Sequence, residues 1–154
     1  MLKNLQTSNN EFANGMNTAS VDMKRGAFVT VDEATHKLSL ANGIAGAFMV
    51  NRGFKLTPLS AMGYPVSDFD EEQDLIKAGE HGYLNVLEGR WATSEFDSTK
   101  ITDSTTVGTY LDIKDGKLTT EGVAGSTIIK FIGWRTVGDH KLCGVEFVPT
   151  VKLA

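Results

Sequence analysis

Cysteine is almost absent from this chain of 154 residues, which contains one, Cys143. A single cysteine cannot form an internal disulfide, and small secreted scaffolds of the disulfide-rich class need several. We therefore expect a protein made in a reducing compartment and stabilised by its apolar core. A chain of this length buries about 70 % of the surface that its unfolded form exposes, so a single domain needs no cross-links. Cys143 stands in the apolar run Leu142–Val145, and we expect it to be a buried core residue.

Long apolar runs and basic clusters are missing as well. The longest nearly unbroken apolar stretch, Gly43–Val50, is far shorter than the roughly 20 residues that span a bilayer, and the first residues lack the apolar core of a signal peptide. The net charge is −4, and no basic cluster exceeds Lys24 and Arg25. Because binding to phosphates requires clustered Lys and Arg, we expect neither a nucleic acid nor a membrane as the partner.

The motifs of common catalytic and cofactor sites are also lacking. The sequence has no nucleophile elbow, no Walker loop and no dinucleotide-binding glycine pattern that opens a helix. The acidic segment Asp68–Asp74 lacks the glycine and the final glutamate that a calcium-binding EF-hand loop requires. None of the histidines has a spacing that places two metal ligands on one face; they are His36, His81 and His140. We therefore predict a protein that is not an enzyme and that has no cofactor and no metal site.

What the chain has in abundance is short β-like segments that are separated by turn residues. Thr, Val and Ile are frequent, and such side chains fit a pleated, half-buried surface. The spacing of the segments, about 8 to 12 residues, is typical of a β-sandwich or β-barrel, so we predict an all-β fold with one small barrel or sandwich and short hairpins. The expected strands are Ala27–Val31, Lys37–Ala41, Ala47–Arg52, Gly82–Leu87, Trp91–Phe96, Val107–Ile113, Lys117–Glu121, Thr127–Val137 and Leu142–Val148.

Two local signals predict specific elements. Asp115 and Gly116 stand between alternating apolar and polar residues, and this pair favours the positive φ angles of a type I′ hairpin turn. Asp68–Lys77 is the one candidate helix, because Asp68 can cap it, acidic residues fill its first turn and Gly79 ends it.

The first 25 residues differ from the rest of the chain. They contain five of its eight asparagines, and their apolar residues occur singly, without a period. Asn side chains compete with regular backbone pairing, so we predict an extended N-terminal arm, residues 1–25, followed by a β-barrel or β-sandwich domain, residues 26–154.

The negative charge is concentrated in one place. The segment 68–74 holds five carboxylates and no basic residue, and removing these five from the 19 acidic residues leaves 14, against 15 basic ones. We therefore expect a nearly neutral body with one acidic contact patch or solvated loop. The patch residues are Asp68, Asp70, Glu71, Glu72 and Asp74.

The aromatic residues suggest a second kind of function, because aromatic side chains can stack on sugar rings. The candidates are Tyr64, Tyr83, Trp91, Tyr110 and Trp134. Alternation along Ile128–Trp134 places Trp134 opposite Ile129 and Phe131, whose face we expect to be buried. We interpret Trp134 as a core or interface residue in preference to a sugar platform.

The order of these segments resembles that of the small β-rich capsid decoration proteins, or head-stabilising cement proteins, of tailed bacteriophages. The resemblance rests on a polar arm before a first strand and on a series of later segments, which are Lys24–Val29, Lys77–Val86 with Glu88-Gly89, Val107–Leu111, Asp115–Leu118, Gly133-Trp134 and Val145–Val148.

This resemblance implies a virion structural protein of all-β fold, made in the host cytoplasm, that binds and stabilises the outer face of an assembled capsid without catalysis. Its partners would be the major capsid protein and copies of itself. The arm would supply the capsid-binding residues, because a segment that orders on binding can lie across a large surface. These residues are Leu5, Phe12, Met16, Met23, Lys24 and Arg25. The alternative is a carbohydrate- or receptor-binding β module of a phage tail, baseplate or head fibre.

Overall fold

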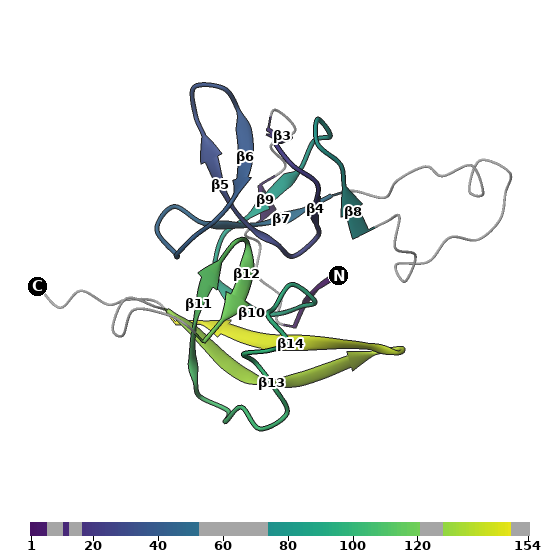
Figure 1. The fold of residues 1–154 in the computed structure, drawn as a ribbon, viewed down its shortest axis with the longest axis vertical. Coiled ribbons are helices and arrows are strands. Elements are labelled where there is room, and N and C mark those ends of the chain that lie inside the picture. Colours follow the sequence, from purple (N-terminus) through teal and green to yellow (C-terminus); the bar gives the residue numbers. More distant parts are fainter. Residues whose placement is uncertain (6–10, 13–16, 53–73, 121–127, 149–154) are drawn as a thin grey trace, which may run out of the picture.

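The computed structural model describes residues 1–5, 11–12, 17–52, 74–120 and 128–148 (Figure 1). Within these ranges the chain forms fourteen strands and no helix, so the predicted all-β class is confirmed. No helix in the described ranges is long and apolar enough to cross a membrane. The strands are β1 (Leu2–Asn4), β2 (Glu11–Phe12), β3 (Thr18–Ala19), β4 (Met23–Lys24), β5 (Phe28–Asp32), β6 (Lys37–Leu40), β7 (Phe48–Asn51), β8 (Leu75–Ile76), β9 (Tyr83–Asn85), β10 (Gly89–Thr93), β11 (Tyr110–Lys114), β12 (Lys117–Thr119), β13 (Ile129–Val137) and β14 (His140–Phe147).

The strands form two large sheets and one small one (Figure 1). The first sheet has the order β1-β10-β14-β13-β11-β12, and the long hairpin of β13 and β14 lies at its centre. The second sheet has the order β2-β9-β7-β5-β6-β3. All neighbours in both sheets are antiparallel except β3 and β6, and the small antiparallel sheet consists of β4 and β8. The backbone of residues 95–97 also bonds Leu118, so β12 is not a bare edge.

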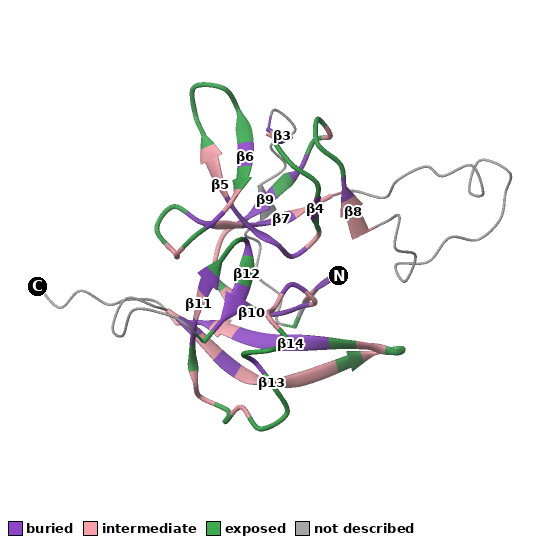
Figure 2. Cartoon of the chain, viewed as in Figure 1, coloured by how far each residue is buried: buried purple, intermediate pink, exposed green. Residues whose placement is uncertain are grey.

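Apolar side chains pack on both faces of the second sheet, and Figure 2 shows buried residues along its strands. Successive side chains of a strand point to opposite faces. On β5, Phe28 therefore packs in the main core with Phe131 and Phe147 of the first sheet. The next residue, Val29, packs in a second core with Met23 and other residues of the small sheet. The second sheet is thus held between the first sheet and the small sheet.

The β11–β12 hairpin joins the two large sheets. Its turn residues have the positive φ angles predicted from the Asp-Gly pair, 49° at Asp115 and 77° at Gly116. The N–H of Gly116 donates a hydrogen bond to the carbonyl of Ala41, and its carbonyl accepts one from the N–H of Phe28, each at 2.9 Å. The turn is therefore bonded by its backbone to the second sheet.

The N-terminal residues differ from the arm that the sequence predicts. β1 is an edge strand of the first sheet and β3 an edge strand of the second, and Leu2, Ala19 and Met23 are buried. The described parts of residues 1–25 therefore pack in the same sheets and cores as the described residues from 26 onward. The reason is that a strand of two or three residues needs only one inward apolar side chain, so its sequence shows no period.

The candidate helix is wrong at Leu75 and Ile76, whereas Asp74 just before them is helical. Leu75–Ile76 is strand β8, and Ile76 pairs with Met23 of β4 in the second core. A weak local helix preference loses to tertiary packing that buries Ile76 completely. Residues 68–73 of that segment lie outside the described residues.

Candidate functional site

A β-bulge in β13 decides which side chains leave the core. Ile129 and Phe131 point into the core, as the alternation predicts. The pairing with β14 then shifts between Phe131 and Gly133, so Ile132 is an extra residue without a partner. Beyond the bulge the alternation is reversed. Trp134 therefore turns to the core side, where its ring centroid lies 5.5 Å from that of Phe131.

One row of paired residues crosses four strands of the first sheet. Lys130 on β13 lies opposite Tyr110 on β11 and Glu146 on β14, and Glu146 lies opposite Arg90 on β10. Residues that face each other in antiparallel strands share a face of the sheet. The neighbours of Lys130 and Glu146 along their strands point into the core, so this row lies on the opposite face.

Two apolar side chains stand exposed on this face. Val107 is 65 % exposed and Tyr110 is 55 % exposed, the highest values among the large apolar side chains that the structure describes. Val107 lies beside Gly133, since its Cγ2 atom is 3.8 Å from the position that a Cβ atom on that glycine would take. Gly133 pairs with Gly144 across β13 and β14, so this pair projects no side chain from the face. Next to it on the same face, Ala92 and Leu142 are buried with Met1 in a third apolar cluster.

Ile132 and Arg135 complete the same face. The Cγ1 atom of Ile132 lies 3.3 Å from the position of a Cβ atom on Gly144, and a guanidinium nitrogen of Arg135 lies 3.6 Å from the equivalent position on Gly133. We call the whole surface the outer face. Its residues are Arg90, Val107, Tyr110, Lys130, Ile132, Arg135 and Glu146.

Of the predicted capsid-binding residues whose side chains the structure describes, Leu5 lies next to the outer face. The N–H of Leu5 donates to the carbonyl of Arg90 at 3.0 Å, and its side chain is exposed. Met23 is buried in the second core and cannot contact a partner in this structure, whereas Lys24 beside it is exposed. Phe12 lies in β2 against β9, and nothing is described of its side chain; Met16 lies outside the described residues.

The predicted acidic patch is described at one position, Asp74. Its carboxylate accepts from the Met1 ammonium at 2.6 Å and from Nε of Arg25 at 3.3 Å, so it is neutralised inside the molecule. Burial lowers the pKa of that ammonium, against the attraction of Asp74, and burial raises the pKa of the nearby Glu95 carboxyl. Asp68, Asp70, Glu71 and Glu72 lie outside the described residues.

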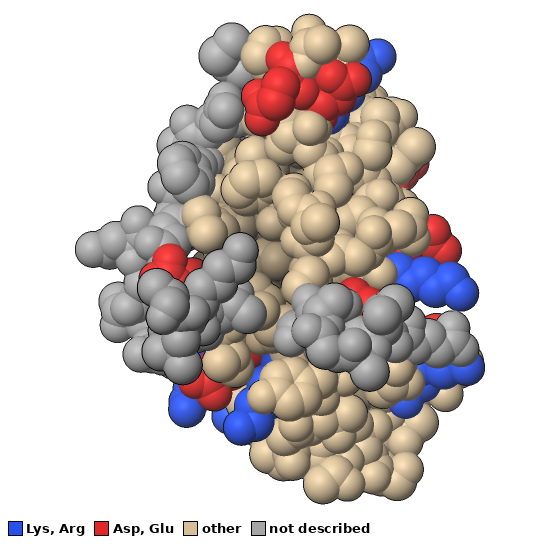
Figure 3. Space-filling model, turned by 90° about the vertical axis from the view of Figure 1, so that its left-hand side faces the viewer, with Lys and Arg blue, Asp and Glu red and all other residues tan. Residues whose placement is uncertain are grey.

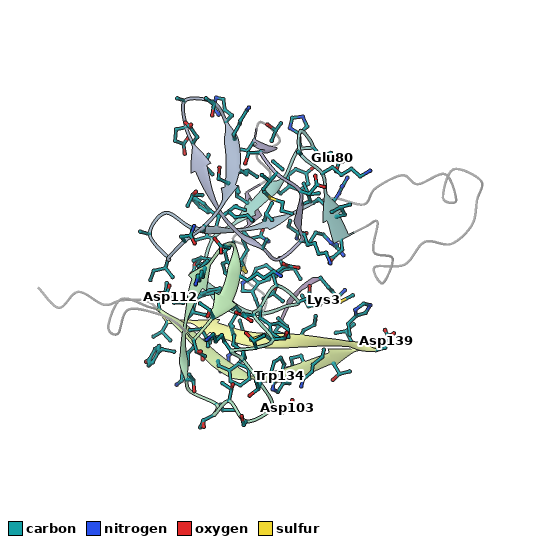
Figure 4. The ribbon with its side chains drawn as sticks, viewed as in Figure 1. Lys3, Glu80, Asp103, Asp112, Trp134 and Asp139 are labelled. Carbon is teal, nitrogen blue, oxygen red and sulfur yellow. The ribbon has the colours of Figure 1, made fainter. Side chains whose placement is uncertain are left out.

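The predicted sugar platform is not assembled. Trp91 is 2 % exposed, and its indole N–H donates to the carbonyl of Glu88. Trp134 is covered by the Lys141 ammonium, 4.1 Å from its ring centre, and Lys141 forms an ion pair with Asp103 (Figure 4). The exposed tyrosines stand on different sheets, Tyr83 on β9 and Tyr110 on β11, and Tyr64 lies outside the described residues.

The groups that could support catalysis are dispersed. No cluster of three or more His, Cys, Asp or Glu that could bind a metal occurs within the described ranges. Cys143 is buried as predicted, and burial raises the pKa of its thiol to about 12, so it remains protonated at neutral pH. The three histidines stand on separate turns and strand ends, at His36, His81 and His140.

A polar depression of about 500 Å³ lies between residues 96–98 and the β11–β12 hairpin. Its charged groups balance, since Lys114 and Lys117 face Asp97 and Asp115. The N–H and hydroxyl groups of Thr99 donate to Asp97, which lowers the pKa of that carboxyl. These groups can form hydrogen bonds and ion pairs with a polar molecule, but no nucleophile with an adjacent base stands among them.

No family model, curated protein or solved structure matches this chain. The functional argument therefore rests on the residues themselves, and on the outer face the two most exposed large apolar side chains of the described residues stand together.

Proposed function

We propose that the protein is a non-enzymatic structural protein of a tailed-bacteriophage virion, which decorates and stabilises the capsid by binding major capsid protein subunits through its outer face. Two arguments support the proposal. The order of segments resembles that of capsid decoration proteins, and the outer face combines exposed apolar and charged side chains as protein-binding surfaces do. The observation that carries most weight is the exposure of Val107 and Tyr110 together on one face of the first sheet.

The physical argument concerns the shape and composition of that face. Gly133, beside the exposed Val107, projects no side chain, so the backbone of a partner can approach the sheet closely there. Tyrosine is enriched among the residues that dominate protein interfaces, because it buries a large area with little loss of side-chain freedom. Charged Arg90 and Glu146 stand at the rim, where partly hydrated ion pairs are expected.

Co-sedimentation with capsids tests the proposal. Expanded heads are assembled from the major capsid protein encoded in the same genome, mixed with the wild-type protein and pelleted. We expect saturable binding with a fixed number of copies per head. Absence of binding would overturn the proposal. Glycan binding by a protein that ignores heads would support the alternative, a carbohydrate- or receptor-binding module of a tail, baseplate or head fibre.

A matched pair of variants locates the binding surface. Tyr110→Ser removes an exposed ring from the outer face, and Tyr83→Ser removes one from the second sheet, where Tyr83 is 40 % exposed. We expect Tyr110→Ser to weaken head binding at least tenfold, or about 1.4 kcal/mol, and Tyr83→Ser to leave it unchanged. Equal effects of the two variants would mean that the outer face is not the contact.

A further inference from the structure

The outer face carries an excess of positive charge in a chain that is negative overall. Arg90, Lys130 and Arg135 stand there against Glu146, while the whole chain has a net charge of −4. Further along β11, on the side of Tyr110, Asp112 and Lys114 add one charge of each sign and leave the excess unchanged. We propose that the surface bound by the outer face is an acidic protein surface, with carboxylates on both sides of an apolar contact. This inference rests on the proposed function and specifies the chemistry of the partner.

Two of the three cations have no carboxylate partner among the described residues. Arg135 donates to the backbone carbonyl of Trp134, which leaves its charge uncompensated. Lys130 lies opposite Glu146 in the register, but the ion pair of Glu146 is with Arg90, at 3.8 Å. The charges of Lys130 and Arg135 are therefore available to an incoming surface.

The neighbours of these cations increase what an ion pair would contribute. Tyr110 lies directly opposite Lys130, and Val107 lies beside Gly133, close to Arg135. When a partner covers Val107 and Tyr110, it excludes water from the same region. An ion pair in such a dehydrated setting is screened less by salt than a fully exposed one.

The strand spacing fixes the arrangement that the partner must match. Arg90 and Lys130 are separated by β14 and its Glu146. Neighbouring strands lie about 4.8 Å apart, so the two cations stand about 10 Å apart across the sheet. A partner with one central basic group and flanking carboxylates would therefore complement the row.

The β5–β6 tip of a second copy of the chain is a weaker candidate for this position. The acidic side chains at the tip of the β5–β6 hairpin lie at the end of the molecule away from the outer face (Figures 1 and 3). The carboxylate of Asp32 already accepts hydrogen bonds from the N–H groups of Ala34 and Thr35 within its own turn. That leaves Glu33 as the main free acid of the tip, too little to neutralise the outer face.

Charge reversal on intact heads tests the inference. Lys130→Glu and Arg135→Glu reverse outer-face charges, and Lys77→Glu reverses an exposed lysine that follows β8. Binding to heads is measured at 50 and 300 mM NaCl, with thermal unfolding as the check of folding. We expect each outer-face reversal to weaken binding at least tenfold at the lower salt concentration, and Lys77→Glu to bind as the wild type does. Wild-type binding should weaken at the higher salt concentration.

The outcomes separate this inference from the proposed function. Wild-type protein that fails to bind heads overturns the proposed function. Wild-type binding that survives Lys130→Glu and Arg135→Glu overturns the acidic partner alone. Lys130→Gln, which removes the charge and keeps the side-chain length, replaces Lys130→Glu if the latter does not fold, and we expect a severalfold loss. Self-association of the wild type that Lys130→Glu abolishes, measured by sedimentation equilibrium without heads, would also overturn the inference.

Discussion

Replacing Gly116 by alanine should destabilise the protein strongly, because this residue holds the β11–β12 turn against the second sheet. Its φ angle of 77° lies in the left-handed region, which favours glycine. A Cβ atom there would lie 2.6 Å from Cδ2 of Leu40 and 3.1 Å from the carbonyl oxygen of Phe28. The leucine methyl can move, but the Phe28 carbonyl accepts the N–H of Ala41 and is fixed in the sheet.

The magnitude follows from two additive costs. A left-handed conformation costs a non-glycine residue about 1 to 2 kcal/mol. Forcing an extra carbon into a packed contact costs about 1 to 3 kcal/mol more. We therefore expect Gly116→Ala to lower the free energy of unfolding by about 2 to 5 kcal/mol, a large share of the stability of a domain of this size.

Gly46→Ala is the matched control, measured with it by urea denaturation. Gly46 has a similar φ angle, 68°, but a Cβ atom on it would meet no other atom within 4 Å. We expect Gly46→Ala to lower the free energy of unfolding by the backbone cost alone, about 1 to 2 kcal/mol. Equal losses in the two variants would refute the reasoning, because they would show that the turn does not press on the second sheet.

Three further predictions concern buried polar groups. Burial raises the pKa of Glu95, so near that pKa the folded state binds more protons than the unfolded state, and the protein loses stability as the pH rises. Glu95→Gln removes this loss. It should therefore stabilise the protein at pH 7, measured by urea denaturation, and should not stabilise it below about pH 4. Asp74→Asn should cost about 3 kcal/mol by removing the partly buried carboxylate that pairs with the Met1 ammonium and Arg25, and an unchanged urea midpoint would contradict this. The Cys143 thiol should resist a thiol reagent at pH 8 until the protein is denatured, and rapid labelling of the native protein would contradict its burial.

Local sequence signals predicted much of the fold. Alternation and turn residues placed β5 and β6 within one residue of their observed bounds, because both strands have apolar residues at every second position facing a core. The Asp-Gly pair predicted the β11–β12 turn, since few residues other than Asn, Asp and Gly adopt its two positive φ angles. Burial of Cys143 followed from its apolar neighbours.

The parts that could not be predicted depend on contacts between distant segments. Met23 is buried because it packs with Ile76, far away in sequence, and a strand of two residues gives no period. The bulge at Ile132 reverses the alternation of β13, so the sequence pattern assigned Trp134 to the wrong face. The sequence offers only Gly133, which has a φ angle of 107°, as a sign of that irregularity.

The outer face could not be predicted from the sequence either, for the same reason. Its row of residues comes from four strands. Tyr110 and Arg90 fall in the same row only because of the register of the two strands between them. Sequence reasoning placed the contact residues in the N-terminal segment, where polar residues with scattered apolar ones are typical of an arm. Of the described members of that set, only Leu5 lies next to the outer face.

A three-dimensional map of heads decorated with the wild-type protein tests the central claim most directly. The β13–β14 hairpin and the β5–β6 tip lie toward opposite ends of the molecule, so the map distinguishes them readily (Figure 1). The account predicts that Val107, Tyr110 and Lys130 contact the capsid shell and that the β5–β6 tip points to solvent. A map in which the outer face points to solvent, with the shell bound through other elements, would contradict it.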